Sequence, residues 1–190
     1  MMSINIEKEE RAMISKETYQ SMVETECHNI VPIKQTNYYF DTTSKLFLSN
    51  HKVLRIRFIS IDNIEITLKE KLVEEDKENN IPISYDLFNK IINLKQEILI
   101  TELGLTFNAD VNLLTSLSTL RYEIDKNEYL LVIDKNEYNN IVDYNIEIES
   151  NISRQHAKKI IIDYSKKYHF DYNENYISKS RRAISNILNN

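Results

Sequence analysis

Charged residues stand at alternate positions in four short stretches of this chain, and three of these stretches carry apolar residues in between. The stretches are Glu7-x-Glu9-x-Arg11, Leu54-Arg55-Ile56-Arg57-Phe58, Ile64 to Lys69, and Ile146-Glu147-Ile148-Glu149. Alternate residues of a β-strand point to the same face of the sheet. Each stretch therefore predicts a strand that is charged on one face, and that face lies either in solvent or inside a closed barrel.

The rest of the chain predicts further strands joined by short turns, with helices between some of them. Aromatic and β-branched residues predict the strands, and apolar residues at helical spacing after Ser15, Ser84 and Ser153 predict the helices. The expected strands span residues 4–13, 35–41, 53–60, 64–69, 117–125, 128–135 and 144–150, with a short edge strand ending near residue 83 and more helix between residues 96 and 115. We therefore expect a single α+β domain over residues 1–190. Its strand number permits an eight-stranded antiparallel β-barrel with flanking helices.

The charge and composition of the chain exclude several classes of protein. Its formal net charge is -5, whereas a general binder of nucleic acid or anionic membrane needs a basic surplus. No apolar run is long enough for a signal peptide or a membrane span, and the single Cys27 cannot form an internal disulfide. We expect a cytoplasmic protein with no nucleic-acid or membrane partner. Gly104 is the only glycine, so side chains rather than a glycine-rich loop would have to hold any bound phosphate.

A solvated sheet face is the simplest explanation of the alternating charges, because antiparallel sheets commonly bury one face and expose the other. Exposed faces usually mix polar residue types, however. Here Arg55 and Arg57 form a purely cationic pair, and Glu147 and Glu149 form a purely anionic one. The predicted helices also provide enough apolar surface to cover the outside of a barrel. Both alternatives stay open at this point.

In a closed barrel, the first and last strands would bring Glu7 and Glu9 to about 5 Å from Glu147 and Glu149. Two carboxylates at that distance repel by about 3 kcal/mol at an effective dielectric constant near 20. Such a cluster favours a cation, and oxygen ligands select Mg²⁺, Mn²⁺ or Ca²⁺. Basic side chains on neighbouring strands would favour an anion rich in oxygens. These are Arg11, Arg55, Arg57, Lys69 and Arg121. A triphosphate with a divalent metal satisfies both groups.

The same residues belong to an ordered set of motifs that resembles the CYTH superfamily, also called triphosphate tunnel metalloenzymes. The set comprises Glu7-Lys-Glu9-Glu-Arg11, Asn37-Tyr-Tyr-Phe-Asp41-Thr, Leu54-Arg55-Ile-Arg57, Glu65-Ile-Thr-Leu-Lys69, Asp134 with Tyr138, Asp143-Tyr-Asn-Ile-Glu147-Ile-Glu149, and Ser178-Lys179-Ser-Arg181-Arg182-Ala. Each motif alone is weakly specific, whereas their order from residue 5 to residue 183 is strongly specific. The chain looks closest to the small bacterial members.

The resemblance implies an eight-stranded tunnel in which basic residues bind a triphosphate and carboxylates bind Mg²⁺ or Mn²⁺. The residues that it assigns to phosphate are Arg11, Arg55, Arg57, Lys69, Arg121, Lys179 and Arg182. Those that it assigns to the metal are Glu7, Glu9, Glu147 and Glu149, with Asp134 and Glu78 as further candidates. The expected catalytic group is Glu7, Glu9, Arg11 and Lys69. Two positions depart from the family pattern, since Arg11 replaces the usual lysine and Asn145 replaces a frequent acidic residue.

Three functions are compatible with such a tunnel. The first is metal-dependent hydrolysis of the terminal phosphoanhydride of a triphosphate, with inorganic tripolyphosphate as the expected substrate. The second is a class IV-type adenylyl cyclase that makes cyclic AMP, for which the sequence offers no identifiable base-recognition pocket. The third is a sensor that binds polyphosphate or nucleotide without turnover. We expect a monomer or a homodimer.

Overall fold

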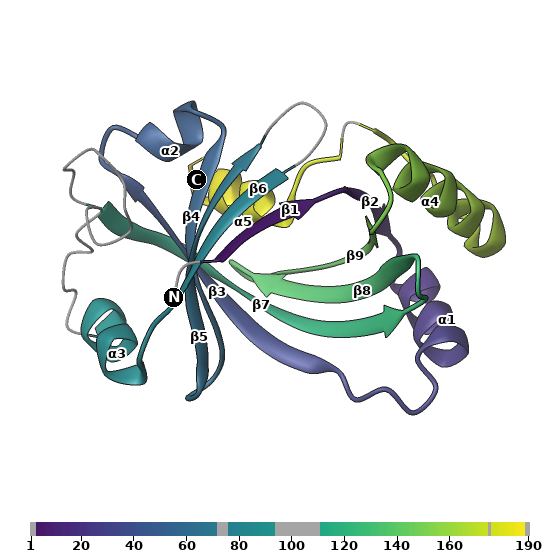
Figure 1. Cartoon of the computed structure of the whole chain (residues 1–190), viewed down its shortest axis with the longest axis horizontal. Coiled ribbons are helices and arrows are strands. Elements are labelled where there is room, and N and C mark those ends of the chain that lie inside the picture. Colours follow the sequence, from purple (N-terminus) through teal and green to yellow (C-terminus); the bar gives the residue numbers. More distant parts are fainter. Residues whose placement is uncertain (1–2, 72–75, 94–110, 175, 189–190) are drawn as a thin grey trace.

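The computed structural model describes residues 3–71, 76–93, 111–174 and 176–188, and in this part of the chain nine strands form one antiparallel sheet. The bounds of the strands are β1 Ser3–Glu7, β2 Glu9–Ile14, β3 Ile33–Thr42, β4 Lys52–Ser60, β5 Asn63–Lys71, β6 Asp76–Pro82, β7 Val111–Asp125, β8 Tyr129–Tyr138 and β9 Ile141–Ser150. The helices of the same segments are α1 Lys16–Glu26, α2 Leu46–Ser49, α3 Tyr85–Asn93, α4 Arg154–Tyr168 and α5 Lys179–Leu188. The sheet is strongly curled, with helices on its outside and α5 at its concave face (Figure 1).

The two edge strands of the sheet, β1 and β2, follow each other directly in the sequence. The strand order is β1-β6-β5-β4-β3-β7-β8-β9-β2, so β1 pairs with β6 at one end and β2 pairs with β9 at the other. Only Lys8 lies between β1 and β2, and its carbonyl oxygen accepts a hydrogen bond from the backbone N–H of Ser150 at 2.9 Å. The predicted strand over residues 4–13 therefore changes partner at Lys8. For this reason the structure has nine strands where the sequence predicted eight, while the antiparallel tunnel fold is confirmed.

Helices α1 and α4 cover the outer face of the strands β2, β8 and β9. Fully buried apolar residues from the helices and the strands form one core there, which includes Ala12, Met22, Ile133, Ile146 and Ile161. Burying each large aliphatic side chain contributes about 1.5–3 kcal/mol. Both helices begin as predicted, because Ser15 and Ser153 each accept a hydrogen bond from a backbone N–H of the first turn.

A second core lies on the outer face of β4 and β5. Leu54 and Ile56 of β4 pack there with Phe47 of α2 and with Phe88 and Ile91 of α3. The apolar residues of the alternating stretches therefore point outwards under the helices, and the charged residues between them point into the tunnel. The alternative of a solvated charged face is wrong for β4.

The short helix α2 was not predicted, and Asp41 explains why it forms. Both carboxylate oxygens of Asp41 accept hydrogen bonds from backbone N–H groups at the start of α2, with 3.0 Å from Phe47 and 3.0 Å from Leu48. A carboxylate at this position satisfies N–H groups that the first turn leaves unpaired and complements the helix dipole.

Helix α5 packs on the inner face of the sheet. Ala183 and Ile184 of α5 contact Tyr39 of β3, Leu117 of β7 and Tyr138 of β8 in a third apolar cluster. Leu117 and Arg121 lie on the same face of β7, since they are separated by an even number of residues. The helix therefore fills one part of the tunnel and leaves the charged part beside it open.

Two local predictions need correction. The expected edge strand before residue 83 is β6, and it lies inside the sheet between β1 and β5. The helix expected between residues 96 and 115 lies mostly outside the described residues, and from Val111 the chain is strand β7. In the described segments, no helix is both long and apolar enough to cross a membrane.

Candidate tunnel site

The inner face of the sheet encloses a cavity of about 490 Å³, a volume in the range of small-molecule sites. Carboxylates and basic side chains line most of it. Its acidic residues include Glu7, Glu9, Asp76, Glu78, Glu147 and Glu149. Its basic residues include Arg11, Arg55, Arg57, Lys69, Arg121 and Lys179. The structure thus gathers around one cavity every predicted site residue except Asp134 and Arg182.

Strand β4 supplies a cationic wall that is only partly neutralised by the protein. Arg55 is buried, and its Nη2 donates to Glu78 at 3.3 and 3.4 Å, but its Nε has no hydrogen-bond partner among the described residues. Arg57 lies 3.4 Å from Glu65 through Nη1, and its Nε is also without a partner there. Burial, followed by the charges of Arg55 and Arg121, lowers the pKa of Arg57 to about 10. This wall therefore favours an oxyanion, which would accept the spare N–H groups.

Other buried polar atoms without a protein partner lie on the same side of the tunnel. Apart from Arg11 Nε, those found in the described segments all belong to strands β3 to β6: atoms of Gln35, Asn37, Arg55, Arg57, Thr67 and Asn80. The facing strands β7, β8 and β9 are paired internally, for example where Asn136 accepts from Thr119 at 2.9 Å and donates to Asn145 at 2.7 Å. Buried polar groups are costly unless they are hydrogen-bonded, so the β3–β6 side is where water or a ligand is needed.

The ammonium group of Lys69 is surrounded by four carboxylates. Its Nζ lies 2.5 Å from Glu7, 2.9 Å from Glu9, 3.1 Å from Asp76 and 3.3 Å from Glu78. The register explains this convergence, because Lys69 pairs with Glu78 across β5 and β6, and Glu7 pairs with Asp76 across β1 and β6. Alternation along β6 then places Asp76 and Glu78 on the same inner face.

Arg11 of β2 joins the acidic clusters to each other. Its Nη2 pairs with Glu9 and lies 3.8 Å from Asp76, and its Nε lies 3.9 Å from Glu147. A planar guanidinium presents its N–H donors in a fixed fork, so it can contact carboxylates that lie in different directions. Arg11 therefore bridges Glu9 and Asp76 to Glu147 in this chain.

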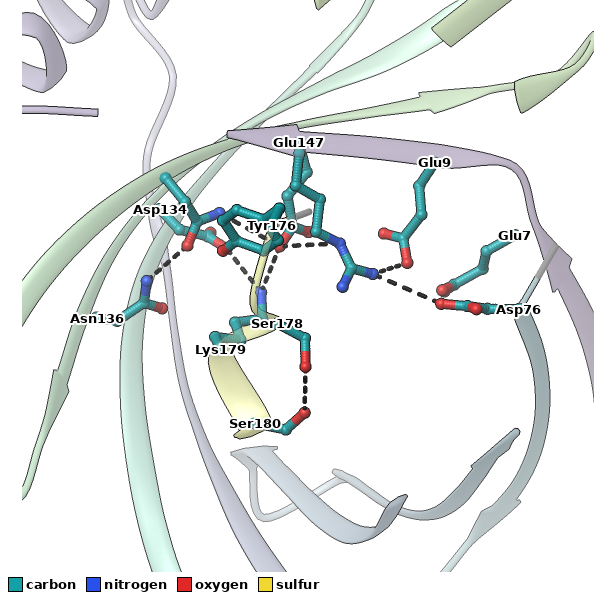
Figure 2. A network of polar contacts seen from close by, with 12 residues as sticks. Glu7, Glu9, Asp76, Asp134, Asn136, Glu147, Tyr176, Ser178, Lys179 and Ser180 are labelled. Carbon is teal, nitrogen blue, oxygen red and sulfur yellow. Dashed lines mark hydrogen bonds and ion pairs between the residues drawn. The ribbon is translucent and has the colours of Figure 1, made fainter. Parts of the chain in front are cut away.

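On the opposite side, Glu147 and Asp134 share the basic groups of Arg121 and Lys179. Arg121 donates to Asp134 at 2.9 and 2.8 Å and to Glu147 at 3.0 Å. Lys179, at the start of α5, donates to Asp134 at 2.7 Å and to Glu147 at 3.1 Å, as Figure 2 shows. Burial alone would raise the pKa of Glu147, but Lys179, Arg121 and Arg11 outweigh it and hold that pKa well below its ordinary value. Glu147 is therefore a carboxylate anion in the folded protein.

Glu149 is in a different electrostatic situation although it lies on the same face of β9. Burial, together with the negative charges of Glu147 and Glu7, raises its pKa to about 7, against the opposing effect of Arg121. One strand thus carries two carboxyl groups whose pKa values are moved in opposite directions. A group that titrates near neutrality is suited to exchanging a proton with a water molecule or to binding a cation.

Two sets of carboxylates are close enough to share a metal ion. One is Glu7, Glu9 and Asp76, the other is Glu9, Glu147 and Glu149, and in each set ligand oxygens lie within 4.8 Å of one another. These hard oxygen donors fit Mg²⁺ or Mn²⁺. Of the six predicted metal ligands, Glu78 and Asp134 fall outside both sets, because Glu78 pairs with Arg55 and Asp134 is fully buried behind Arg121.

Asp76 is a site residue that the sequence analysis missed. It stands in the charge-rich stretch after Lys69, which also reads as a solvated loop. The available signal was its spacing of two residues from Glu78, since that spacing puts both on one face of a strand.

Two further predicted positions, Asn145 and Arg182, have structural partners within the protein. Asn145 donates from Nδ2 to Glu147 at 3.2 Å and accepts from Asn136, so it orients the carboxylate that it neighbours. Arg182 does not line the cavity, although it was predicted to contact phosphate. Its guanidinium is instead bonded to Asp143 and to the hydroxyl of Tyr176.

The fold and the site together define a class of tunnel protein, and the comparisons with known proteins identify its family. The family model described as the CYTH domain matches residues 5–176, so the chain belongs to the CYTH family. This family includes triphosphatases and class IV adenylyl cyclases, and its members are metal-dependent enzymes. No curated protein matches the chain significantly.

Solved structures with the same fold cover nearly the whole chain. A Bacillus halodurans protein provisionally named an adenylate cyclase has 24% sequence identity and a TM-score of 0.79, covering 94% of this chain and 97% of its own. A Hippeastrum protein, provisionally named the adenylyl cyclase HpAC1 and described as having a dominant triphosphatase activity, has 20% identity and a TM-score of 0.71, covering 95% of each chain. The protein PH1012 of Pyrococcus horikoshii has 18% identity and a TM-score of 0.60, covering 94% and 99%. At these identities the similarity shows the fold.

Proposed function

We propose that this protein is a metal-dependent triphosphatase that hydrolyses the terminal phosphoanhydride of inorganic tripolyphosphate. One observation carries the proposal: the same cavity holds guanidinium groups with unpaired N–H donors and carboxylate sets that fit a divalent cation. A triphosphate carries the anionic oxygens that the first group lacks. Its metal complex carries the cation that the second group lacks.

The chain's own residues would position the phosphate chain and exclude competing orientations. Arg55 and Arg57 on one wall, and Arg121 and Lys179 on the other, would hold phosphate oxygens from two sides and stabilise charge that develops during the reaction. Glu7, Glu9, Asp76, Glu147 and Glu149 would hold Mg²⁺ or Mn²⁺. When bound, the metal would neutralise phosphate charge and polarise the bond that is cleaved. In the metal-free protein the pKa of Glu149 is about 7, and with the metal on Glu7, Glu9 and Asp76 this carboxyl group would stay available to accept a proton from the attacking water.

The cavity lining favours an inorganic chain over a nucleotide. Among the described residues that line it, Tyr39 and Tyr176 are the aromatic ones apart from His51, and Tyr39 is only 1% exposed. Purine recognition in proteins relies on apolar or aromatic surface together with a few polar groups. Most of the other lining side chains are charged, and Val53 and Ile177 are the aliphatic ones among the described residues. Adenylyl cyclase activity is the second candidate, and it is supported by the names given to two structures of the same fold.

Phosphate release from tripolyphosphate, ATP and thiamine triphosphate, each with Mg²⁺ and with Mn²⁺, tests the proposal. We expect turnover with tripolyphosphate and its loss on addition of EDTA. Arg55→Ala and Glu147→Ala should abolish this turnover. The first removes a guanidinium that would donate hydrogen bonds to phosphate, and the second removes a carboxylate from one of the two sets that fit a metal. Lys135→Ala and Glu137→Ala are matched controls, since these residues form an ion pair on the outer side of the barrel and do not line the cavity.

Each of the other results would contradict the proposal. Formation of cyclic AMP from ATP without phosphate release would support the cyclase. Binding of tripolyphosphate without turnover under any metal condition would support a sensor. Full activity of Arg55→Ala or Glu147→Ala would show that the reaction takes place elsewhere.

A further inference from the structure

Lys69 occupies the position that a metal ion would take between three of the carboxylates. Its ammonium group lies within 3.1 Å of oxygens from Glu7, Glu9 and Asp76, and these three residues are one of the two carboxylate sets that fit a metal. A divalent cation held by the same oxygens would have to share them with an ammonium ion at short distance. Because like charges repel strongly in a partly buried site, the two cations exclude each other there.

Lys69 also has a place to go when the carboxylates are taken by another cation. In the register of β4 and β5, Lys69 pairs with Val53, and Arg55 pairs with the neighbouring inward residue Thr67. The side chain of Lys69 therefore stands next to Arg55 on the inner face, beside the wall whose spare N–H groups favour an oxyanion. A four-carbon stem with a rotatable ammonium can turn from the carboxylates to an anion on that wall.

The overall charge of the cavity lining also favours binding of a cation together with an anion. The described lining carries eight carboxylates and ten basic side chains, so it is close to balance without ligands. A divalent cation alone makes this lining more positive, and a polyphosphate alone makes it more negative. The two together change the balance less than the polyphosphate alone, because the divalent cation offsets part of its negative charge.

We propose that Lys69 is a placeholder cation that couples metal binding to anion binding. In the empty tunnel it neutralises Glu7, Glu9 and Asp76. When a divalent cation takes these carboxylates, Lys69 turns to a phosphate oxygen beside Arg55. The proposal rests on the proposed function in one respect, namely that the anion is a phosphate. Coupling of this kind is reciprocal, so the anion should raise metal affinity as much as the metal raises anion affinity.

Mn²⁺ binding to the purified protein, followed by the loss of the electron paramagnetic resonance signal of free Mn²⁺, tests this directly and needs no turnover. Inorganic sulfate serves as the oxyanion, because it holds Mn²⁺ only weakly in solution. For the unaltered protein, we expect weak Mn²⁺ binding without sulfate and at least about tenfold tighter binding with saturating sulfate, which corresponds to about 1.4 kcal/mol of coupling. For Lys69→Met, we expect tight Mn²⁺ binding without sulfate and almost no further gain with it.

Two variants distinguish a placeholder from a general effect of charge. Lys71→Met removes the same charge from the same face of β5, but Lys71 has no carboxylate partner among the described residues, so Mn²⁺ binding should change by less than about threefold. Lys69→Arg keeps a cation and should keep Mn²⁺ binding weak without sulfate. Thermal unfolding of each variant identifies any that fails to fold.

The outcomes separate this inference from the proposed function. If the unaltered protein binds Mn²⁺ equally tightly with and without sulfate, or if Lys71→Met tightens binding as much as Lys69→Met, then Lys69 is not a placeholder. Tripolyphosphate hydrolysis can still be present in that case. Conversely, coupled Mn²⁺ and sulfate binding without any phosphate release would leave the exchange intact and contradict the triphosphatase.

Discussion

Arg182 of α5 and Asp143 of β9 form a two-pronged ion pair, in which Nε and Nη2 of the arginine each donate to one carboxylate oxygen at 2.8 Å. The hydroxyl of Tyr138 donates to the same carboxylate at 2.6 Å. This pair fixes the start of α5 against the sheet, and the first residue of that helix, Lys179, reaches Glu147. The motif Ser178 to Ala183 therefore contains residues that line the cavity, Lys179 among them, and another, Arg182, that positions the helix.

Replacing Arg182 separates a positioning role from phosphate contact. Arg182→Ala should lower the stability of the ligand-free protein by about 1–3 kcal/mol, because it leaves the partly buried Asp143 without its charged partner. Chemical denaturation in the absence of phosphate measures this. The double variant with Asp143→Ala should be less destabilised than the sum of the single variants. Unchanged stability with a large rise in the KM for tripolyphosphate would instead support direct phosphate contact.

Arg121 is expected to be essential for stability as well as for the site. Its guanidinium is buried and bonded to both Asp134 and Glu147, and Asp134 is fully buried. Removing one partner of a buried charged pair typically costs about 3–5 kcal/mol, and without Arg121 the two buried carboxylates would have to share Lys179. Arg121→Ala should therefore lower Tm strongly in thermal unfolding. The double variant Arg121→Ala/Asp134→Ala should have a higher Tm than Arg121→Ala alone.

In contrast to Arg121, Arg57 should not be needed for stability, although both line the same cavity. Burial and the charges of Arg55 and Arg121 lower its pKa to about 10, so its charged form is disfavoured in the ligand-free fold. Arg57→Met keeps most of the apolar stem and removes this charge, and Tm in phosphate-free buffer should stay level or rise. The same variant should lose about 10- to 100-fold in kcat/KM for tripolyphosphate, the range expected for a hydrogen bond to a charged group. A clear fall in Tm would contradict the excess positive charge that we describe for this wall.

Glu149 gives a pH dependence with a defined sign. Its pKa rises from 4.5 to about 7 on folding, so between these pH values the folded protein holds a proton that the unfolded chain has released. Its effect is therefore to make stability fall as the pH rises through this interval, with the full penalty above pH 7. Glu149→Gln should raise Tm relative to the unaltered protein at pH 8, measured in EDTA, and should change it little at pH 5.

An exposed glutamate provides the control for that measurement. The pKa of Glu137 is lowered by its hydrogen bond to Lys135, so Glu137→Gln should not raise Tm at pH 8. If Glu149→Gln and Glu137→Gln change Tm with the same pH dependence, then the pKa of Glu149 is not raised on folding.

The sequence predicted the inward faces well where residues alternate strictly. The alternation of a β-strand is enough to place Arg55 with Arg57, and Glu147 with Glu149, on one face of the sheet. The only further step is to infer that this charged face points into the tunnel. Asp76 needed more, because its role depends on the register of β6 with both β1 and β5, and register is set by contacts between distant segments.

Side chains on α5 were harder to assign than those on the strands. The sequence shows Lys179, Arg181 and Arg182 together, but which of them faces the cavity depends on how the helix is rotated against the sheet. That rotation is fixed by Ala183 and Ile184 packing on Tyr39, Leu117 and Tyr138, which come from three different strands. Local pattern contains no information on such a contact.

The change of partner at Lys8 has a consequence for the order in which the protein is assembled. Glu7 pairs with Asp76, whereas Glu9 pairs with Glu149. During synthesis on a ribosome, the segment around Lys8 emerges long before β9, so its second half must wait for that strand before it can pair. The carboxylates of the site therefore meet only after β9 has been made, and we expect the tunnel to close late in folding, because contacts between distant segments form slowly.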